Sequence, residues 1–340
     1  MKAILIPHPP EFEYTTVPDP DCVTGEVVIR TAYCGICGTD LDILQGTMPE
    51  NFARYPVVPG HEWTGEVVEV GRGVNNLRIG DRVSVEGYLP CGQCPRCRAG
   101  NNNLCVKHEQ IGMTRHGGLA EFVAAPAVSC HIVAPHVSLD EALMVEPAST
   151  VVRGIERANP GEGSAAAVIG CGAIGLIAAR VLARYSPRAV LGIDLAASQA
   201  SMAELAGFTE FTTDIQATTL KDRSGSDGWD LVIVAAPGPK ALELGFQIIR
   251  PGGALVSIGG SADSERVDLA ANYFLTRDVR VEGILGYSTQ SWTRTLRLVA
   301  EGQLKLGDLI SHRAPLSDFR RALDLTVSRG EPVGKVAICF

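Results

Sequence analysis

Four cysteines lie close together in the sequence, with two, two and seven residues between successive members: Cys91, Cys94, Cys97 and Cys105. Four thiolates at this spacing match the tetrahedral coordination of Zn²⁺. The segment 86–109 around them is polar and glycine-rich, and it cannot form an apolar core of its own. Because four protein ligands leave no open position, we expect a structural zinc ion. An iron–sulfur cluster also takes four thiolates, and four unrelated buried thiols are the other alternative.

Two more segments carry metal-ligand side chains. Cys37 lies in G-I-C-G-T-D at 35–40, and His61 and Glu62 lie in P-G-H-E at 59–62. Each segment is ambiguous by itself. A buried cysteine usually contributes to packing, and a single histidine is usually a surface or core residue with satisfied hydrogen bonds and not a metal ligand. The spacing of these residues alone therefore does not assign a site.

The stretch Ala165–Asp194 predicts a nucleotide-binding unit. An apolar run at 166–169 predicts a buried strand, G-C-G-A-I-G follows at 170–175, and an apolar-periodic segment predicts a helix. A second apolar run, 189–193, ends at Asp194. Strand, glycine-rich turn, helix, strand and acid in this order are typical of dinucleotide binding.

Each residue of this unit has a physical reason. Gly170 permits a tight turn, Gly172 lets a pyrophosphate approach the backbone, and Gly175 lets the helix pack closely on the strand. The helix N-terminus offers free N–H groups to phosphates. The Asp194 carboxylate can accept both ribose hydroxyls and would repel a 2′-phosphate, and no arginine follows within 195–198. NAD is therefore favoured over NADP.

The bulk composition limits the remaining possibilities. A chain of 340 residues with 46% hydrophobic residues predicts about two packed domains. A net charge of −8 without a basic run argues against binding to nucleic acid or to an anionic membrane. The N-terminus has no signal-peptide pattern and no apolar stretch is long enough to span a membrane, so we expect a cytoplasmic protein. Ten cysteines in a reducing compartment favour metal binding over disulfides.

The pattern of elements changes along the chain. Residues 1–85 predict strands, 138–152 predict a helix interrupted at Pro147, and from 163 onward strands and helices alternate, which predicts a parallel sheet. Further elements are expected at these positions: strands at 119–124, 129–133, 231–235, 254–258, 279–285 and 334–340, and helices at 239–249, 290–300 and 317–329. We place one domain at 1–150 and 287–340 and the other at 151–286.

The motifs together resemble the zinc-dependent medium-chain dehydrogenase/reductase family, which includes alcohol, sorbitol and threonine dehydrogenases. GICGTD, PGHEWTGEVVEVG, the four-cysteine lobe and the glycine-rich unit occur in the family's order and span nearly the whole chain. The resemblance implies an α/β protein with a GroES-like, mostly-β catalytic domain and a doubly wound Rossmann domain. It implies two zinc ions per chain and NAD. The catalytic zinc is implied to bind Cys37 and His61, with Glu146 first and Glu62 second as the third ligand.

The resemblance also implies catalytic roles near Cys37. Thr39 matches the hydroxyl that takes the substrate proton, and Asp40 is expected to accept the second N–H of His61. Turn capping is the alternative for both residues. Many relatives carry a relay histidine where this chain has Asp42, so the proton route is open to Asp42, water or the cofactor ribose.

The same resemblance implies that further residues contact the cofactor: Thr150, Ile174, Gln199, Ile258, Gly259 and Leu285. The alternative for each of them is an ordinary position in the core or in a loop.

The sequence constrains the identity of the substrate and the oligomeric state least. Arg115 and His116 lie in a segment that borders the cleft in this family, although a solvated loop is an equal alternative. We expect a polar secondary alcohol, such as a polyol, sugar, cyclitol or aminocyclitol, or the matching ketone. The alternatives are a simple alcohol dehydrogenase, a ketone or aldehyde reductase, and a non-catalytic nucleotide-binding protein. Residues 279–285 are expected to form an edge strand, and because relatives pair such strands between subunits, the resemblance implies a homodimer or homotetramer.

Overall fold

The computed structural model describes residues 1–49, 51–107, 109–260, 264–328 and 330–340, which form two compact units. Unit 1 comprises Met1–Glu146, Ser288–Ser328 and Lys335–Phe340, and unit 2 comprises Pro147–Tyr287 and Arg329–Gly334. The predicted boundaries at 150 and 286 lie close to these limits. The sequence predicts that all of 287–340 belongs to the first domain. In the structure, however, Arg329–Gly334 belongs to unit 2 and interrupts this C-terminal part of unit 1.

Unit 1 is built on an antiparallel sheet in the order β14-β15-β3-β4-β5-β7, with β6 also paired to β3 and with β14 and β15 parallel to each other. A separate hairpin joins β1 to β2. The strands have these bounds: β1 (Lys2–Leu5), β2 (Glu13–Thr16), β3 (Glu26–Ile36), β4 (Trp63–Val70), β5 (Arg82–Val85), β6 (Phe122–Pro126), β7 (Cys130–Ile132), β14 (Ile310–Pro315) and β15 (Lys335–Cys339).

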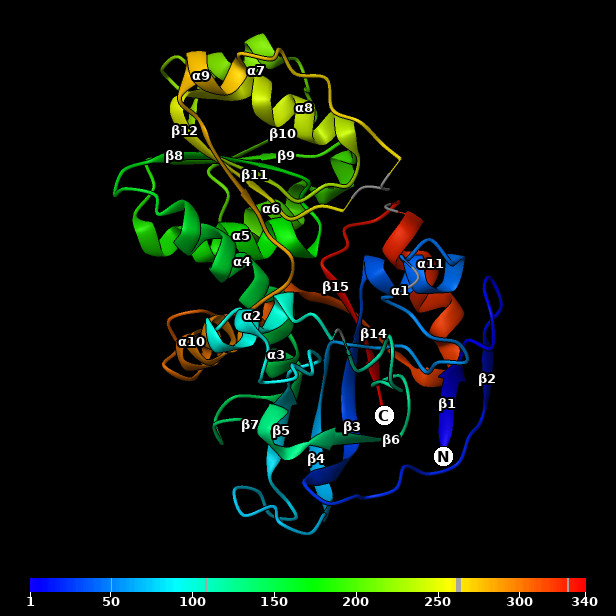
Figure 1. Ribbon diagram of the computed structural model, residues 1–340. Helices are drawn as coiled ribbons and strands as arrows, with labels where there is room; N and C mark the ends of the chain where they lie inside the picture. The colour runs from blue at the N-terminus through cyan, green and yellow to red at the C-terminus, as the bar shows by residue number, and fades with distance from the viewer. Residues whose placement is uncertain (50, 108, 261–263, 329) are drawn as a thin grey trace. The chain divides into compact units, whose positions relative to one another are not determined.

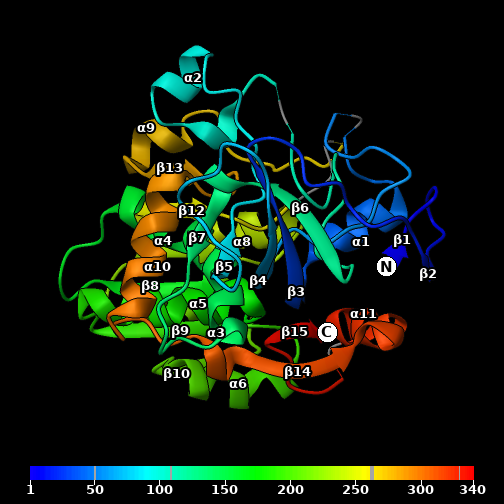
Figure 2. The ribbon, with the colours of Figure 1, turned by 90° about the horizontal axis from the view of Figure 1, so that it is seen from below.

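The helices of unit 1 are short or amphipathic: α1 (Gly38–Gln45), α2 (Pro95–Arg98), α3 (Leu139–Leu143), α10 (Thr289–Ala300) and α11 (Phe319–Ser328). Helix α11 packs against β14 and β15, as Figure 2 shows. Strand β3 pairs antiparallel with both β4 and β15, with Cys34 opposite Trp63 and Ile36 opposite Val336. The end of β3 therefore lies beside the starts of β4 and β15.

Unit 2 contains a six-stranded sheet in which every pair is parallel, in the order β10-β9-β8-β11-β12-β13. The order reverses at β8, as in a doubly wound dinucleotide-binding sheet. The strands have these bounds: β8 (Ala165–Ile169), β9 (Ala189–Ile193), β10 (Glu210–Thr212), β11 (Trp229–Val234), β12 (Ile249–Ser257) and β13 (Arg280–Gly283). Strand β13 is an edge strand, as predicted for 279–285.

Helices cover both faces of this sheet: α4 (Val145–Ala158), α5 (Ala173–Leu182), α6 (Ala200–Ala206), α7 (Ala217–Asp222), α8 (Pro239–Ile248) and α9 (Tyr273–Arg277). Figure 1 shows α7, α8 and α9 on one face and α4, α5 and α6 on the other. The core on the α8 face includes Trp229, Phe246 and Leu255. Because both faces are buried, β8 is apolar throughout.

The structure differs from the prediction for 138–152 in the position at which the helix is interrupted. The break falls at Met144, between α3 and α4, and not at Pro147. Pro147 lies in the first turn of α4, where backbone N–H groups have no intrahelical partner and a proline costs little. The helix then runs on to Ala158. Across the described part of the chain, no helix combines the length and the hydropathy needed to cross a bilayer.

Candidate functional site

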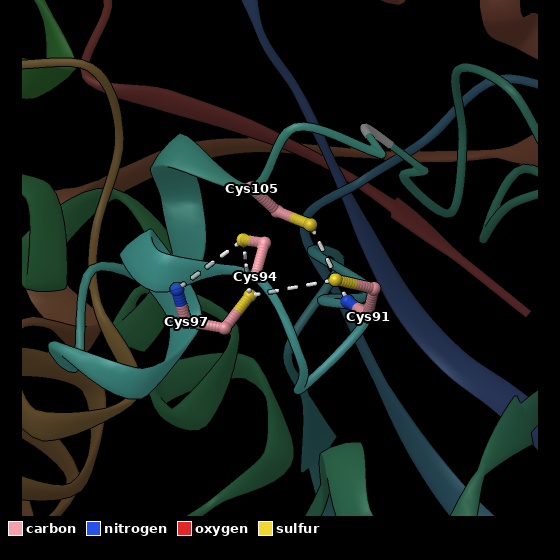
Figure 3. A group of neighbouring side chains, drawn as sticks. All are labelled: Cys91, Cys94, Cys97 and Cys105. Carbon is pink, nitrogen blue, oxygen red and sulfur yellow. Dashed lines mark hydrogen bonds between the residues drawn. The ribbon is translucent and has the colours of Figure 1, made fainter.

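The four cysteines of the lobe converge on one point. The ligand atoms of Cys91, Cys94, Cys97 and Cys105 all lie within 4.8 Å of one another, and Figure 3 shows their sulfur atoms facing each other. Cys94 caps α2 by accepting the N–H of Cys97 at 3.4 Å, and Cys105 accepts the N–H of Cys91 at 3.3 Å. Such N–H···S bonds orient thiolates around an ion, so the arrangement fits Zn²⁺.

The thiols of the lobe differ in acidity. Hydrogen bonds from the backbone N–H groups of Val106 and Cys97 lower the pKa of Cys94 to about 6. Burial and hydrogen bonds with the neighbouring thiols raise the pKa of Cys97 to about 12. Backbone N–H groups also lower the pKa of Cys91, so Cys91 and Cys94 ionise more readily than Cys97. Metal binding here releases protons, so zinc affinity falls as pH falls.

A hydrogen-bond chain anchors the lobe to the sheet of unit 1. Asn102, between the third and fourth cysteines, donates to Thr289 Oγ1 at 3.0 Å, and this hydroxyl donates to Glu86 Oε2 at 2.9 Å. Glu86 Oε1 in turn lies 2.7 Å from His131 Nε2. A partly buried polar tether thus joins the lobe to the rest of unit 1.

A second set of ligand atoms lies where three strand ends meet. Cys37 follows β3, and His61 and Glu62 precede β4; their ligand atoms lie within 4.8 Å of one another. His61 is 4% and Glu62 1% exposed. The structure thus brings together three of the four predicted ligands, taken from segments more than twenty residues apart in the sequence.

Asp40 organises the ends of these segments. Its carboxylate accepts the N–H of Cys37 at 2.9 Å and that of Gly60 at 3.3 Å. Its Oδ1 also lies 3.7 Å from His61 Nδ1, which is buried and has no hydrogen-bond partner among the described residues. This distance exceeds a hydrogen bond, but the orphaned Nδ1 points to Asp40 as its partner and leaves Nε2 for a metal ion. A half-buried sulfur with a buried imidazole and a buried carboxylate fits Zn²⁺.

Lys335 completes the surroundings of Glu62, and no motif in the sequence predicts this role. Its Nζ donates to the two carboxylate oxygens of Glu62 at 2.8 and 2.6 Å and to Ile36 O at 3.3 Å. Burial by itself lowers the pKa of Lys335, but the Glu62 carboxylate outweighs this effect and raises it. The only signal in the sequence was a single lysine in the otherwise apolar strand K-V-A-I-C.

Gly35 makes room for this carboxylate. A Cβ atom at this position would lie 2.3 Å from Glu62 Oε2. Any larger residue here would therefore displace Glu62 from Lys335 and from the metal-ligand set. The glycine in G-I-C-G-T-D is thus explained by a close approach and not by a turn.

Glu146, which the resemblance ranked first as third ligand, lies outside the set of three within 4.8 Å. It is buried, and burial raises the pKa of its carboxyl to about 8 although His61 opposes the shift. The charges of Glu62 and Asp40 act in the same direction as burial. Glu146 therefore belongs to the same cluster of interacting charges as Glu62, His61 and Asp40.

The remaining residues expected near Cys37 are placed as follows. Thr39 is half-buried, with Oγ1 3.8 Å from Cys37 Sγ. Asp42 is exposed and its Oδ1 accepts the Thr47 hydroxyl at 3.2 Å. Arg115 is engaged by Glu26 at 2.9 Å, and His116 Nδ1 accepts the N–H of Val58 at 3.0 Å.

The glycine-rich turn has the geometry that its sequence predicts. Gly170 has φ +95°, and a Cβ there would lie 2.6 Å from the backbone nitrogen of Ala236. A Cβ at Gly175 would lie 1.9 Å from Gly170 O. Gly172 and Ile174 are half-buried at the start of α5, so the turn remains accessible to a phosphate.

Asp194 closes this turn from the end of β9. Its Oδ2 accepts the N–H of Cys171 at 2.7 Å and its Oδ1 the N–H of Ala196 at 2.9 Å. Each carboxylate oxygen can accept a second hydrogen bond. The acid is thus held against the turn by two backbone N–H groups.

The other residues expected to contact the cofactor differ in their burial and in their hydrogen bonds. Thr150 is buried, and Leu285 is exposed with its carbonyl accepting from Arg153 at 3.3 Å. The N–H groups of Ile258 and Gly259 both donate to Val234 O at 3.0 Å. Gln199 is 1% exposed and its amide bonds to backbone groups.

Comparison with known proteins extends these observations. The family model described as alcohol dehydrogenase GroES-like domain matches residues 23–135, and the one described as zinc-binding dehydrogenase matches residues 173–301. The expected fold, a GroES-like domain with a Rossmann domain, is thereby confirmed. The expectation of zinc is also confirmed, by the second family model together with the four-cysteine site.

Relatives align along almost the whole chain. The L-threonine 3-dehydrogenase of Streptomyces coelicolor is 32% identical over 345 residues, covering 99% of each chain. The erythritol/L-threitol dehydrogenase of Mycolicibacterium smegmatis is 29% identical and covers 98% of this chain and 96% of that protein. A crystal structure described as a short chain alcohol dehydrogenase from E. coli CFT073 complexed with NADH has a TM-score of 0.92 at 26% identity, covering 100% of this chain and 99% of that chain. The chain belongs to the zinc-dependent medium-chain dehydrogenase family.

Proposed function

We propose that this protein oxidises, with NAD, a secondary alcohol that carries a neighbouring polar group, such as a polyol, a sugar alcohol or a cyclitol. The observation that carries the proposal is the convergence of the half-buried Cys37 with the buried His61 and Glu62. Two relatives support the substrate class, because L-threonine and erythritol each bear a hydroxyl next to a carbon with an amino or hydroxyl group. The reverse reaction, reduction of the matching ketone, uses the same groups.

Cys37, His61 and a carboxylate would hold the catalytic zinc, with Glu62 first and Glu146 as the alternate. Zinc, when bound, supplies a Lewis acid that lowers the pKa of a hydroxyl and so favours loss of its proton. A thiolate, one carboxylate and a neutral imidazole would balance its two charges. Lys335 offsets the extra negative charge that the second carboxylate brings to this buried cluster.

The chain's own residues would orient the reacting hydroxyl and move its proton. Thr39, half-buried and beside Cys37, would accept the proton at Oγ1 and pass its own to water. Asp40 would fix the tautomer of His61 by facing Nδ1. The exposed Asp42 would serve as the last acceptor before solvent.

The cofactor preference rests on Asp194. Its carboxylate is fixed by two backbone N–H groups and would accept the ribose hydroxyls of NAD, whereas the 2′-phosphate of NADP would meet a buried negative charge. The next residue, Leu195, is exposed and apolar, so it offers no counter-charge. NAD is the cofactor we propose.

The test is an assay of the purified, zinc-loaded protein. We expect about two zinc ions per chain and reduction of NAD by polyols or cyclitols at least about tenfold more efficiently than by ethanol or 2-propanol. L-threonine and NADP form two further arms. Activity on simple alcohols alone would contradict the substrate class, a preference for NADP would contradict the role of Asp194, and a single zinc with no turnover would indicate a non-catalytic protein.

Assembly and compartment are further parts of the proposal. We infer a homodimer or homotetramer through the edge strand β13, where Val281 is exposed, as is Leu285 just after the strand. A monomeric mass by light scattering would contradict this. All ten cysteines are free, which fits a reducing compartment such as the cytoplasm.

A further inference from the structure

The side-chain amide of Gln199 is buried and bonded at both ends. Its Nε2 donates to Cys171 O and to Val333 O, each at 2.8 Å, and its Oε1 accepts the N–H of Val333 at 2.7 Å. The side chain is 1% exposed. Both amide hydrogens are used, so little of the group's bonding capacity remains for a ligand.

The partners of this amide belong to two functionally different segments. Cys171 is the second residue of the glycine-rich turn, and its N–H is already held by Asp194. Val333 lies in residues 330–334, which we call the strap. The strap is packed in unit 2, with Val333 buried, although α11 before it and β15 after it belong to unit 1. Gln199 thus ties the strap to the turn that is expected to hold the pyrophosphate.

The strap leads directly to the metal-ligand cluster. Two residues after Val333, Lys335 donates to both carboxylate oxygens of Glu62 and to Ile36 O. Only Gly334 lies between Val333, bonded to Gln199, and Lys335, bonded to Glu62, so little chain separates the two clamps. A displacement of the glycine-rich turn thus has a short covalent route toward the Glu62 carboxylate.

We propose that Gln199 is a positioning residue that couples the nucleotide turn to the metal-site carboxylate through the strap, and not a ribose ligand. This inference rests on the proposed function, since it requires a nucleotide at the turn and zinc at the cluster. Ordering of the turn by the cofactor would stabilise the strap, and the strap would hold Lys335 against Glu62. Because coupling is reciprocal, zinc binding should also favour the cofactor.

The first experiment measures the clamp itself by hydrogen exchange. In Gln199→Met the strap amides, with Val333 first, should exchange at least about tenfold faster than in the wild type, because three buried hydrogen bonds are lost. Gln199→Glu keeps an acceptor for Val333 but sets a buried carboxylate against the carbonyl oxygens of Cys171 and Val333, so strap exchange should rise at least as much as in Gln199→Met. The matched control is Gln247→Met, on the exposed side of α8.

The second experiment measures coupling. The rate at which the labile zinc passes to a coloured chelator is recorded with and without saturating NADH. In the wild type and in Gln247→Met, NADH should slow release, and in Gln199→Met this protection should fall to about half or less while lobe zinc is retained. A Co²⁺-substituted protein should show the same loss as a smaller spectral change on adding NADH.

The outcomes separate the possible failures. Faster exchange of the strap with full NADH protection of the zinc would overturn the coupling and leave only a structural brace. Unchanged exchange of the strap would overturn the clamp, and absence of NADH protection in the wild type would overturn the coupling without any variant. A wild type that binds neither NADH nor a second zinc would refute the proposed function, whereas the exchange experiment would still test the clamp.

Discussion

The two clusters of metal-ligand side chains are built in opposite ways. The four thiols of the lobe come from residues 91–105 and lie in a polar loop stabilised by N–H···S bonds. Cys37, His61 and Glu62 come from separate segments, and the buried charges of Asp40 and Lys335 surround them. A cluster of identical ligands from one loop saturates its ion and shapes the loop. A mixed, tertiary cluster can leave its ion a free position, which chemistry requires.

The largest effect should come from His61→Ala. We expect a loss of turnover of at least about a thousandfold, equal to about 4 kcal/mol, because the ion at the mixed cluster is lost. Zinc analysis should show about one ion per chain, retained by the lobe. Retention of both activity and the second zinc would break the contrast between the two clusters. His8→Ala, at an exposed histidine, is the matched control.

A smaller effect is expected from Lys335→Met in the zinc-free protein. The Glu62 carboxylate would remain buried without its counter-charge, which should lower the free energy of unfolding by about 3 kcal/mol. Urea unfolding in the presence of chelator measures this. Lys335→Arg should lose less, and adding Glu62→Gln to Lys335→Met should restore stability. A double variant as unstable as the single one would show that the charge of Glu62 is not the cause.

Cys105→Ser tests the closed cluster. It should remove the lobe zinc and lower the melting temperature by about 5 °C, because the coreless loop loses its organising ion. The specific activity of the folded fraction should stay within about twofold of the wild type, since the mixed cluster is untouched. Cys22→Ser changes a half-buried thiol outside both clusters and serves as the control. Loss of turnover with full stability would reverse the assigned roles.

The smallest effect is expected from Thr289→Val, which cuts the tether between Asn102 and Glu86. We expect a loss of about 1 kcal/mol in unfolding free energy, with faster hydrogen exchange in the lobe than elsewhere. Thr293→Val, on the exposed side of the same helix, should change less. Equal exchange in the lobe of both variants would mean that the zinc alone holds this loop.

The sequence predicted most of unit 2 and less of the end of the chain. The apolar runs of β8, β9, β11 and β12 stand out because a parallel sheet buries both faces. Strand β14, I-S-H-R-A-P, was missed because its polar residues and terminal proline give no clear alternation. Its pairing with β15 depends on a long-range contact that no local pattern reports.

The same distinction holds within the functional site. By its own spacing and residue types, the sequence determined the lobe, the glycine-rich turn and Asp194, because each depends on neighbours along the chain. Only the tertiary structure brought Glu62 together with Cys37 and His61, set Lys335 against Glu62, and bonded Gln199 to the strap. These contacts join residues far apart in the sequence, and the packing and charge balance of the folded sheets select them.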